Sequence, residues 1–236
     1  MKRFDRRKFL KTTTFSAAAI STSGLISGYK NQDKILEPSL NYMGDFSAPK
    51  LETIRTAFIG VGARGSGHLK AFSNIEGLEV VAICDLHKDL VESSSKIAKD
   101  IGNGDKHLNI AQYYGSDKSW IKMLNDIHPD VVFISTNWDN HAPMAIESMQ
   151  NGSHCFVEVP LAVTIDDLWK IVNVSEKTRK HCMMMENVNY GRDELMFLNM
   201  CRKGVIGDLL HAEAAYIHEL RFQMSQIERG TGSWRT

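Results

Sequence analysis

The stretch IRTAFIGVGARG, residues 54–65, decides the fold, together with LEVVAICD at residues 78–85. Each stretch contains a short apolar run, and a segment with helical spacing lies between them, so the predicted order is strand, helix, strand. The glycines form the Gly-x-Gly-x-x-Gly pattern that opens the helix of a dinucleotide-binding unit. The sequence therefore predicts a Rossmann-type unit at this point of the chain.

The three glycines have separate roles in that pattern. Gly60 permits the tight turn out of the first strand, and Gly62 lets the backbone approach a pyrophosphate. Gly65 lets the following helix pack close to the strand, with its first N–H groups facing the phosphates. Ala63 and Arg64 complete the turn. We expect these five residues to bind the cofactor.

An acidic residue, Asp85, follows the second apolar run, twenty residues after Gly65. A carboxylate there can accept hydrogen bonds from a ribose 2′-hydroxyl and would repel a 2′-phosphate, which favours NAD over NADP. A glycine-rich turn without a ligand is the alternative interpretation of a lone Gly-x-Gly-x-x-Gly pattern. The flanking strands and the acid in register favour the NAD site.

The composition is that of an ordinary globular protein. Of the 236 residues, 43% are hydrophobic, and 28 basic residues balance 28 acidic ones, so no net charge draws the chain to nucleic acid or an anionic membrane. No apolar run reaches the length of a membrane span, and we expect no stable membrane anchor. A homo-oligomer fits this composition, but the sequence does not fix the oligomeric state. Four cysteines lack metal-ligand spacing and read as buried thiols, so no metal is expected; they are Cys84, Cys155, Cys182 and Cys201.

The N-terminal segment carries an export pattern. The run RRKFLK at residues 6–11 precedes a weakly apolar stretch rich in Ala, Ser and Thr, which predicts a bacterial twin-arginine (Tat) signal over residues 1–28. A basic tail is the alternative interpretation. Because the Tat machinery carries folded proteins, a cofactor can be loaded before export to the periplasm or beyond. An exported NAD enzyme makes best sense if each turnover returns NAD to its starting redox state.

Beyond a polar linker at residues 29–53, strand and helix signals alternate over residues 54–188. This alternation predicts an α/β fold, a Rossmann-type doubly wound parallel sheet. The expected strands are 54–59, 78–84, 112–114, 130–135, 154–157 and 182–186. The expected helices are 66–74, 89–101, 116–126, 143–151 and 165–179.

Residues 189–236 predict the start of an incomplete α+β second domain. A helix is expected at 193–203 and a strand at 209–218, after which the chain stops at Thr236. One strand has no partner to pair with, so we expect the second domain to be truncated.

Polar residues follow three successive strands of the predicted sheet. Trp138-Asp139-Asn140-His141 follows the fourth strand, Glu158-Val159-Pro160 follows the fifth, and Glu186-Asn187 ends the sixth. Polar groups at neighbouring strand ends are what a bound nicotinamide and ribose require. For His141 alone, a helix-cap or surface histidine is the alternative interpretation.

Taken together, these residues resemble the Gfo/Idh/MocA oxidoreductase superfamily and, more narrowly, glycoside hydrolase family 109. The residues that carry the resemblance are Gly-Val-Gly-Ala-Arg-Gly at 60–65, Trp-Asp-Asn-His at 138–141, Glu-Val at 158–159, Glu-Asn-Val-Asn-Tyr at 186–190, Leu-Asn-Met at 198–200, Ala-Tyr-Ile-His at 215–218 and Trp-Arg at 234–235. Many dehydrogenases of the superfamily carry a lysine where this chain has Val159. That difference favours the glycosidase branch.

The resemblance implies a tightly held NAD, contacted by Arg64, Gly65, Asp85, Trp138, Asp139, Asn140, His141, Glu158, Val159 and Asn187. It implies that Tyr216 and Arg235 contact the sugar, and that the substrate is a glycan or small molecule with a terminal α-linked N-acetylgalactosamine. The implied reaction oxidises C3 of the sugar, removes the C2 proton and expels the aglycone from C1. Water then adds to C1 and the hydride returns to C3, which agrees with the argument from export.

The sequence departs from the family at its end. A Tyr-Pro-Thr-His motif that the family is thought to use in catalysis would lie beyond Thr236, so no catalytic residue is assigned. Tyr190 is a weak candidate, for which a structural hydrogen bond is the alternative. The principal hypothesis is an NAD-dependent glycosidase represented by its N-terminal half. The alternatives are a net sugar dehydrogenase of the same superfamily and a non-catalytic remnant that binds dinucleotide or sugar.

Overall fold

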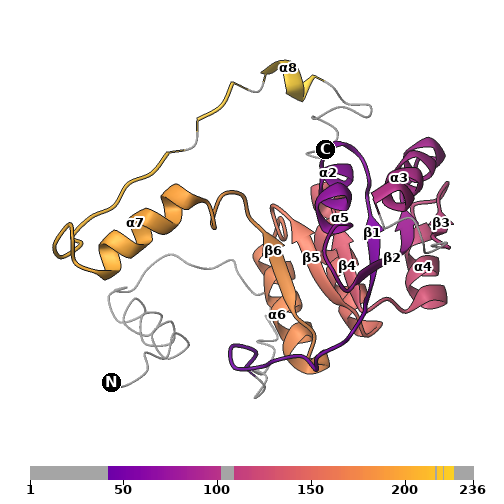
Figure 1. The fold of residues 1–236 in the computed structure, drawn as a ribbon, viewed down its shortest axis with the longest axis horizontal. Helices are drawn as coiled ribbons and strands as arrows, with labels where there is room; N and C mark the ends of the chain where they lie inside the picture. Colours follow the sequence, from indigo (N-terminus) through magenta and orange to yellow (C-terminus); the bar gives the residue numbers. More distant parts are fainter. Residues whose placement is uncertain (1–41, 102–108, 216, 220, 226–236) are drawn as a thin grey trace, which may run out of the picture. The chain divides into compact units, whose positions relative to one another are not determined.

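The computed structural model describes residues 42–101, 109–215, 217–219 and 221–225 (Figure 1). The predicted signal segment 1–28 and residues 29–41 of the predicted linker lie outside the described residues, as do Tyr216 and Arg235. Among the helices that the structure describes, none is long and apolar enough to cross a membrane.

Within the described residues, six parallel strands form one sheet in the order β3-β2-β1-β4-β5-β6. The chain therefore starts at the centre of the sheet and builds outward in two directions, as in a doubly wound fold. The fold prediction is confirmed, and each predicted strand differs at its ends by at most one residue. The strands are β1 (Ile54–Ile59), β2 (Leu78–Cys84), β3 (Ala111–Tyr113), β4 (Val131–Ile134), β5 (His154–Glu158) and β6 (Cys182–Met185).

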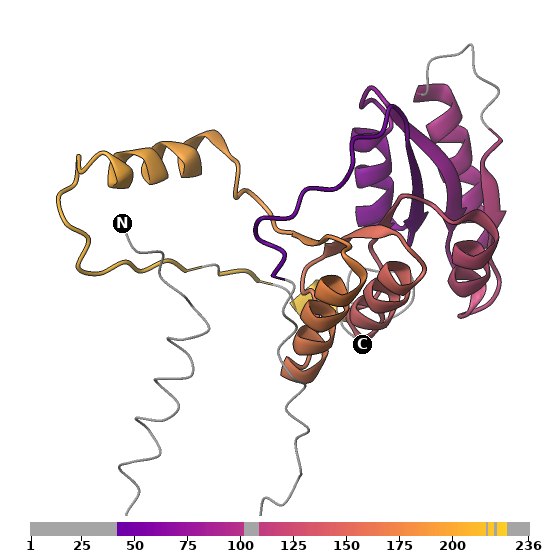
Figure 2. The same ribbon diagram turned by 90° about the horizontal axis from the view of Figure 1, so that it is seen from below.

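Helices cover both faces of this sheet (Figure 2). One buried cluster joins α2 and α3 to the sheet, and the other joins α4, α5 and α6 to its opposite face. The helices are α2 (Ala63–Phe72), α3 (Lys88–Ile101), α4 (Ser119–Ile127), α5 (Trp138–Gln150), α6 (Ile165–Thr178), α7 (Arg192–Arg202) and α8 (Arg221–Met224).

The two clusters follow from the alternation of side chains along each strand. In β1, Ala57 and Ile59 belong to the cluster under α4, α5 and α6, whereas Phe58 between them belongs to the cluster under α2 and α3. Phe58 stacks on Phe133 at 4.8 Å between ring centroids, and Phe133 stacks on Phe156 at 4.9 Å. This aromatic row crosses three neighbouring strands, and Phe72 of α2 packs on it. Each aromatic pair adds about 0.5–1.5 kcal/mol to the stability of the fold.

Two of the helix starts that differ from the prediction bear on the site. Helix α5 begins at Trp138 rather than Pro143, and α2 begins at Ala63 rather than Ser66. A proline is typical of the first turn of a helix, which is why position 143 was expected to start α5. In the structure Pro143 lies inside the helix and Asn137 occupies the N-cap position. Residues 138–141 therefore form the first turn of α5 instead of a loop.

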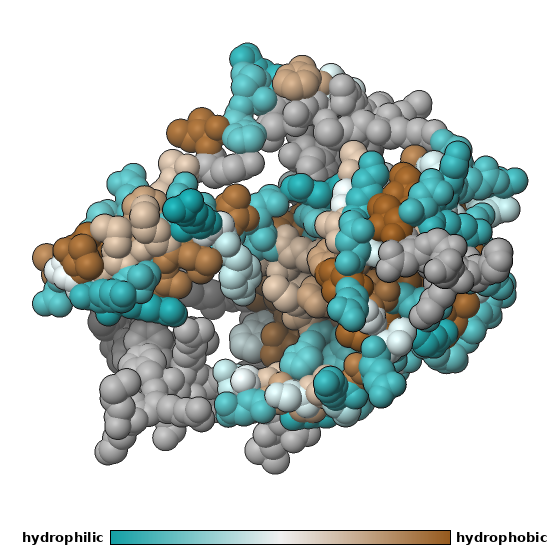
Figure 3. All heavy atoms as spheres, in the orientation of Figure 1, coloured by the Kyte–Doolittle hydropathy of each residue, from teal (hydrophilic) through white to brown (hydrophobic). Residues whose placement is uncertain are grey.

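The expected strand at 209–218 is wrong: residues 209–215, 217 and 218 form no strand in the structure. A strand is defined by its hydrogen bonds to a neighbour, and the described part of this region offers none. Helix α7 does form, close to the expected range, but none of its residues is buried. Figure 3 shows apolar side chains on the surface of this part of the chain. Met196 and Phe197 of α7 are 49% and 61% exposed.

Part of the predicted linker packs against the sheet domain. The Phe46 ring lies 5.1 Å from the His181 ring, and the Arg179 guanidinium lies over Phe46 at 4.3 Å from the ring centroid. Arg179 also donates a hydrogen bond to the Tyr42 carbonyl at 3.5 Å. These contacts attach residues 42–46 beside the start of β6.

Candidate functional site

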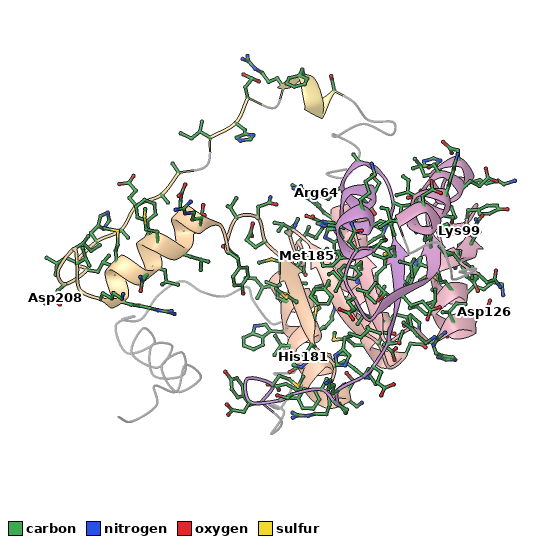
Figure 4. All side chains as sticks on the ribbon, in the orientation of Figure 1. Arg64, Lys99, Asp126, His181, Met185 and Asp208 are labelled. Atoms are coloured by element: carbon green, nitrogen blue, oxygen red, sulfur yellow. The ribbon has the colours of Figure 1, made fainter. Side chains whose placement is uncertain are left out.

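The predicted site residues gather at the carboxyl ends of the strands. Strands β1 and β4 are neighbours at the centre of the sheet, and the chain leaves them toward opposite faces, which makes the switch point where such folds bind ligands. Figure 4 labels Arg64 at the start of α2 and Met185 at the end of β6, both on this edge, with His181 at the opposite end of β6.

Two of the glycines are required by close packing. Gly60 has a φ of +81°, and a Cβ atom there would lie 2.4 Å from the Ser135 carbonyl oxygen. A Cβ atom on Gly65 would lie 1.9 Å from the Gly60 carbonyl oxygen. These distances are shorter than any van der Waals contact, so only glycine lets β1, β4 and α2 meet here. The predicted roles of Gly60 and Gly65 therefore have a direct structural basis.

Gly62 is different, because its Cβ position is open. No described heavy atom lies within 4 Å of that position. Gly62 is also the N-cap residue of α2, and in the described structure no side chain caps the helix and no acidic residue lies in its first turn. No described side chain thus competes for the start of this ten-residue helix, and a helix start of this kind can bind an anion such as a pyrophosphate. These residues fit a dinucleotide.

Asp85 reaches the same turn from the end of β2. One carboxylate oxygen accepts a hydrogen bond from the Val61 N–H at 2.8 Å, and the other accepts from the His87 N–H at 2.9 Å. The carboxylate is therefore held beside the glycine turn, where each oxygen still has a lone pair to offer a ribose hydroxyl. This is the placement that the spacing between Gly65 and Asp85 predicts.

Glu158, at the end of β5, is the centre of a polar cluster. Its Oε1 lies 2.6 Å from His68 Nε2 and 3.2 Å from Arg64 Nε, and its Oε2 accepts a hydrogen bond from the Val159 N–H at 3.1 Å. Burial acts to raise the pKa of this carboxyl, because only 6% of the residue is exposed. The hydrogen bonds from His68 and Val159 and the Arg64 charge outweigh burial, and the pKa is lowered overall. Glu158 is thus an ionised, buried acceptor.

Arg64 extends this cluster to the end of β6. Its guanidinium donates to the Asn187 side-chain oxygen at 3.4 Å, so the Arg64 side chain contacts Glu158 and Asn187, which are both predicted to bind the cofactor. The side chain of Arg64 is 46% exposed, which leaves part of its charge accessible at the edge. Val188, which follows Asn187, has a φ of 53°, an unfavourable backbone for a β-branched residue.

His141 is buried rather than a surface or capping residue. It is 1% exposed, with Nδ1 at 2.7 Å from the Pro160 carbonyl oxygen and Nε2 at 3.1 Å from the Thr136 carbonyl oxygen. The ring therefore joins the segments that follow β4 and β5. On the same turn of α5, Asp139 and Asn140 are exposed at the edge.

Sequence reasoning missed His68, which has the shortest contact to Glu158. A signal existed: His68 lies four residues after Arg64, and residues with this spacing share one face of a helix. One other candidate, Tyr190, does not join the cluster. Tyr190 is 78% exposed beyond β6, and Tyr216 and Arg235 lie outside the described residues.

Comparison with known proteins agrees with this geometry. Residues 54–186 match the model of the oxidoreductase family with an NAD-binding Rossmann fold, Gfo/Idh/MocA. The chain belongs to this family. Residues 190–234 match the model of the C-terminal domain of glycosyl hydrolase family 109, the branch that the sequence resembles.

The chain is similar to curated proteins of that branch. It is 51% identical over 235 residues to a glycosyl hydrolase family 109 protein of Shewanella pealeana, covering 99% of this chain and 50% of that protein. It is 47% identical over 239 residues to an alpha-N-acetylgalactosaminidase of Shewanella oneidensis, covering 100% and 51%. The chain thus spans about half the length of the curated relatives it matches.

Among solved structures, an NAD-binding protein from Listeria innocua is similar, with 27% sequence identity and a TM-score of 0.55. The match covers 67% of this chain and 43% of that one. Both the fold and the NAD-binding family are therefore the ones that the sequence predicts.

Proposed function

We propose that this chain is the NAD-binding part of a glycosidase that hydrolyses α-N-acetylgalactosaminides. The observation that carries the proposal is the open, uncapped start of α2 at Gly62, with Asp85 beside it. It is supported by the near-complete match of the chain to a relative named alpha-N-acetylgalactosaminidase. When bound, NAD supplies a hydride acceptor that oxidises C3 of the sugar and later gives the hydride back.

The residues of the chain have separate tasks in this proposal. The N–H groups at the start of α2 hold the pyrophosphate, and Asp85 holds the adenosine ribose. Glu158 and Asn187, joined by Arg64, would hold the other half of the cofactor at the ends of β5 and β6. The first turn of α5, with Trp138, completes the edge.

Val159 supports a glycosidase rather than a net dehydrogenase. Its N–H donates to Glu158, but its side chain has no group that can exchange a proton with a sugar hydroxyl. At this position the chain therefore lacks the acid–base group that many dehydrogenases of the family have there. A cycle that returns the hydride is the one that does not accumulate NADH.

The test uses an aryl α-N-acetylgalactosaminide in deuterated water, with this chain and with a form extended to the length of the relatives. Aryl release and deuterium at C2 of the sugar are followed by NMR, and NADH is followed by absorbance. We expect release with deuterium at C2 from the extended form. NADH that builds up without aryl release would refute the glycosidase and leave a dehydrogenase, and no reaction of either kind would refute the substrate.

We also propose that the protein is exported by the Tat machinery to the periplasm or beyond, because of the arginine pair and the small-residue stretch at 1–28. The test replaces both arginines in a tagged protein, as Arg6→Lys with Arg7→Lys, and compares periplasmic and cytoplasmic fractions. Equal periplasmic amounts of the two forms would refute the proposal.

A further inference from the structure

His68 contacts the polar cluster around Glu158, although it is not part of the glycine pattern. It is on α2, one turn after Arg64, and its Nε2 is 2.6 Å from Glu158 Oε1, across 90 residues of sequence. An ionised carboxylate only accepts hydrogen bonds, so His68 Nε2 must carry the hydrogen in this contact. Of the two side chains on Oε1, His68 is closer than Arg64, which is at 3.2 Å.

The His68 ring also packs near aromatic side chains of the core. The ring lies 6.2 Å from the Phe72 ring, and Phe72 lies 4.3 Å from Phe133 in the aromatic row of the core. The side chain of His68 is 22% exposed, against 46% for Arg64, so the histidine is the more enclosed of the two donors. A donor that is held by packing fixes its acceptor more narrowly than a solvent-exposed guanidinium does.

Removal of His68 would leave Glu158 buried with one weaker side-chain donor. A buried carboxylate that loses a hydrogen bond either binds a proton or turns toward solvent. Either change releases Arg64, which contacts Glu158 and Asn187 at once. The arrangement of three side chains at the ends of β5 and β6 therefore depends on one imidazole.

We propose that His68 is a positioning residue for NAD: it holds the Glu158 carboxylate, and through it Arg64 and Asn187, in the arrangement that receives the cofactor. This inference rests on the proposed NAD site. It predicts that His68 acts on the affinity for NAD only through Glu158.

The test measures NAD affinity by calorimetry for His68→Leu, His68→Gln, Glu158→Gln and the double variant His68→Leu with Glu158→Gln. His68→Leu should weaken NAD binding by about ten- to a hundred-fold, as expected for a lost hydrogen bond to a charged group. His68→Gln, whose amide nitrogen can still donate to Oε1, should stay within about threefold of the unchanged chain. In the Glu158→Gln background, His68→Leu should have little further effect, because the group that it positions is already altered.

A matched control is His128→Asn. His128 is also a histidine whose ring bonds a side chain, at 2.8 Å from the Asn151 oxygen, but it follows α4 at the opposite edge of the sheet, and asparagine tolerates its φ of 47°. NAD affinity of this variant should not change. Circular dichroism melting curves without NAD show that each variant is folded. If His68→Leu does not fold, His68→Asn replaces it, because its shorter amide does not reach Oε1.

Three results would overturn the inference: full affinity in His68→Leu, a failure of His68→Gln to restore it, or an equal loss when Glu158 is already replaced. The last result would mean that the histidine supports the fold of α2 rather than the carboxylate. A folded, unchanged chain that binds no NAD would instead refute the proposed function, and the inference with it. The two failures are therefore distinguished by the unchanged chain alone.

Discussion

Gly62→Ala should weaken NAD binding while the fold is kept. The added methyl group meets no described atom within 4 Å, and Gly62 has a φ of −66°, which suits alanine, with a ψ of −154° just outside the extended range that L-residues favour. The substitution reduces the freedom of the unfolded chain, which offsets the backbone cost, so the free energy of unfolding should stay within about 1 kcal/mol of the unchanged chain. The methyl group, however, occupies the space through which a pyrophosphate approaches the N–H groups of α2.

The cost in affinity follows from those N–H groups. Loss of one charge-assisted hydrogen bond between an N–H and a phosphate oxygen costs about 1.5–3 kcal/mol, which corresponds to about ten- to a hundred-fold in the dissociation constant. Gly65→Ala is the contrasting variant. Its Cβ atom would lie 1.9 Å from the Gly60 carbonyl oxygen, so α2 must move away from β1 at a cost of about 1–3 kcal/mol in stability.

The assay is calorimetric titration with NAD, together with urea unfolding of each apo variant. Gly62→Ala should stay within about 1 kcal/mol of the stability of the unchanged chain yet bind NAD far more weakly, whereas Gly65→Ala should lose stability. If Gly62→Ala binds NAD with unchanged affinity, the pyrophosphate does not lie over this turn and the proposed site is wrong. If Gly62→Ala loses more stability than expected, its surroundings are not as open as the structure indicates.

Three further predictions concern other parts of the same domain. Asp85→Asn removes the charge that would repel a 2′-phosphate, so the preference for NAD over NADP should fall by about tenfold in paired titrations, and an unchanged ratio would contradict the role of Asp85. Burial, and then the charges of Lys180 and His181, lower the pKa of His154 from 6.5 to about 4. Because the unfolded chain binds this proton first as the pH falls, the free energy of unfolding should drop between about pH 6.5 and 4, by roughly 1–2 kcal/mol after allowing for solvent screening. His154→Asn should flatten that part of the pH profile of urea unfolding. Val188→Asn places a residue that tolerates positive φ at 53° and should raise the free energy of unfolding by about 1 kcal/mol, whereas a lower stability would mean that the valine is not strained.

The strands were predictable because a buried parallel strand is a continuous apolar run, as in Leu78–Cys84. Asp85 was predictable for the same reason, since the end of such a run fixes where the next polar residue lies. The start of α5 was not, because Pro143 is a stronger local signal than the asparagine cap that the fold uses. A local rule gave way there to the burial of His141 in the added turn, where its ring lies between the Thr136 and Pro160 carbonyl oxygens.

The contact between His68 and Glu158 could not be read from the sequence. It joins residues 90 positions apart, and only the order of the strands brings the face of α2 toward the end of β5. The wrong strand at 209–218 has the opposite origin: its alternation is a local signal, but a strand also needs a neighbour that no local pattern supplies. The glycine turn and Asp85 are thus set by spacing along the sequence, whereas the contact between His68 and Glu158 is set by the order of the strands.

The attachment of residues 42–46 beside the start of β6 has a practical consequence. Phe46 packs on His181 and Arg179 at the amino ends of the strands, so the described chain begins on the side of the sheet away from Gly62 and Glu158. A purification tag or surface linkage placed ahead of Tyr42 is therefore joined to the domain at the end remote from the cofactor edge. Immobilised through that end, the protein would keep its dinucleotide site open to solution.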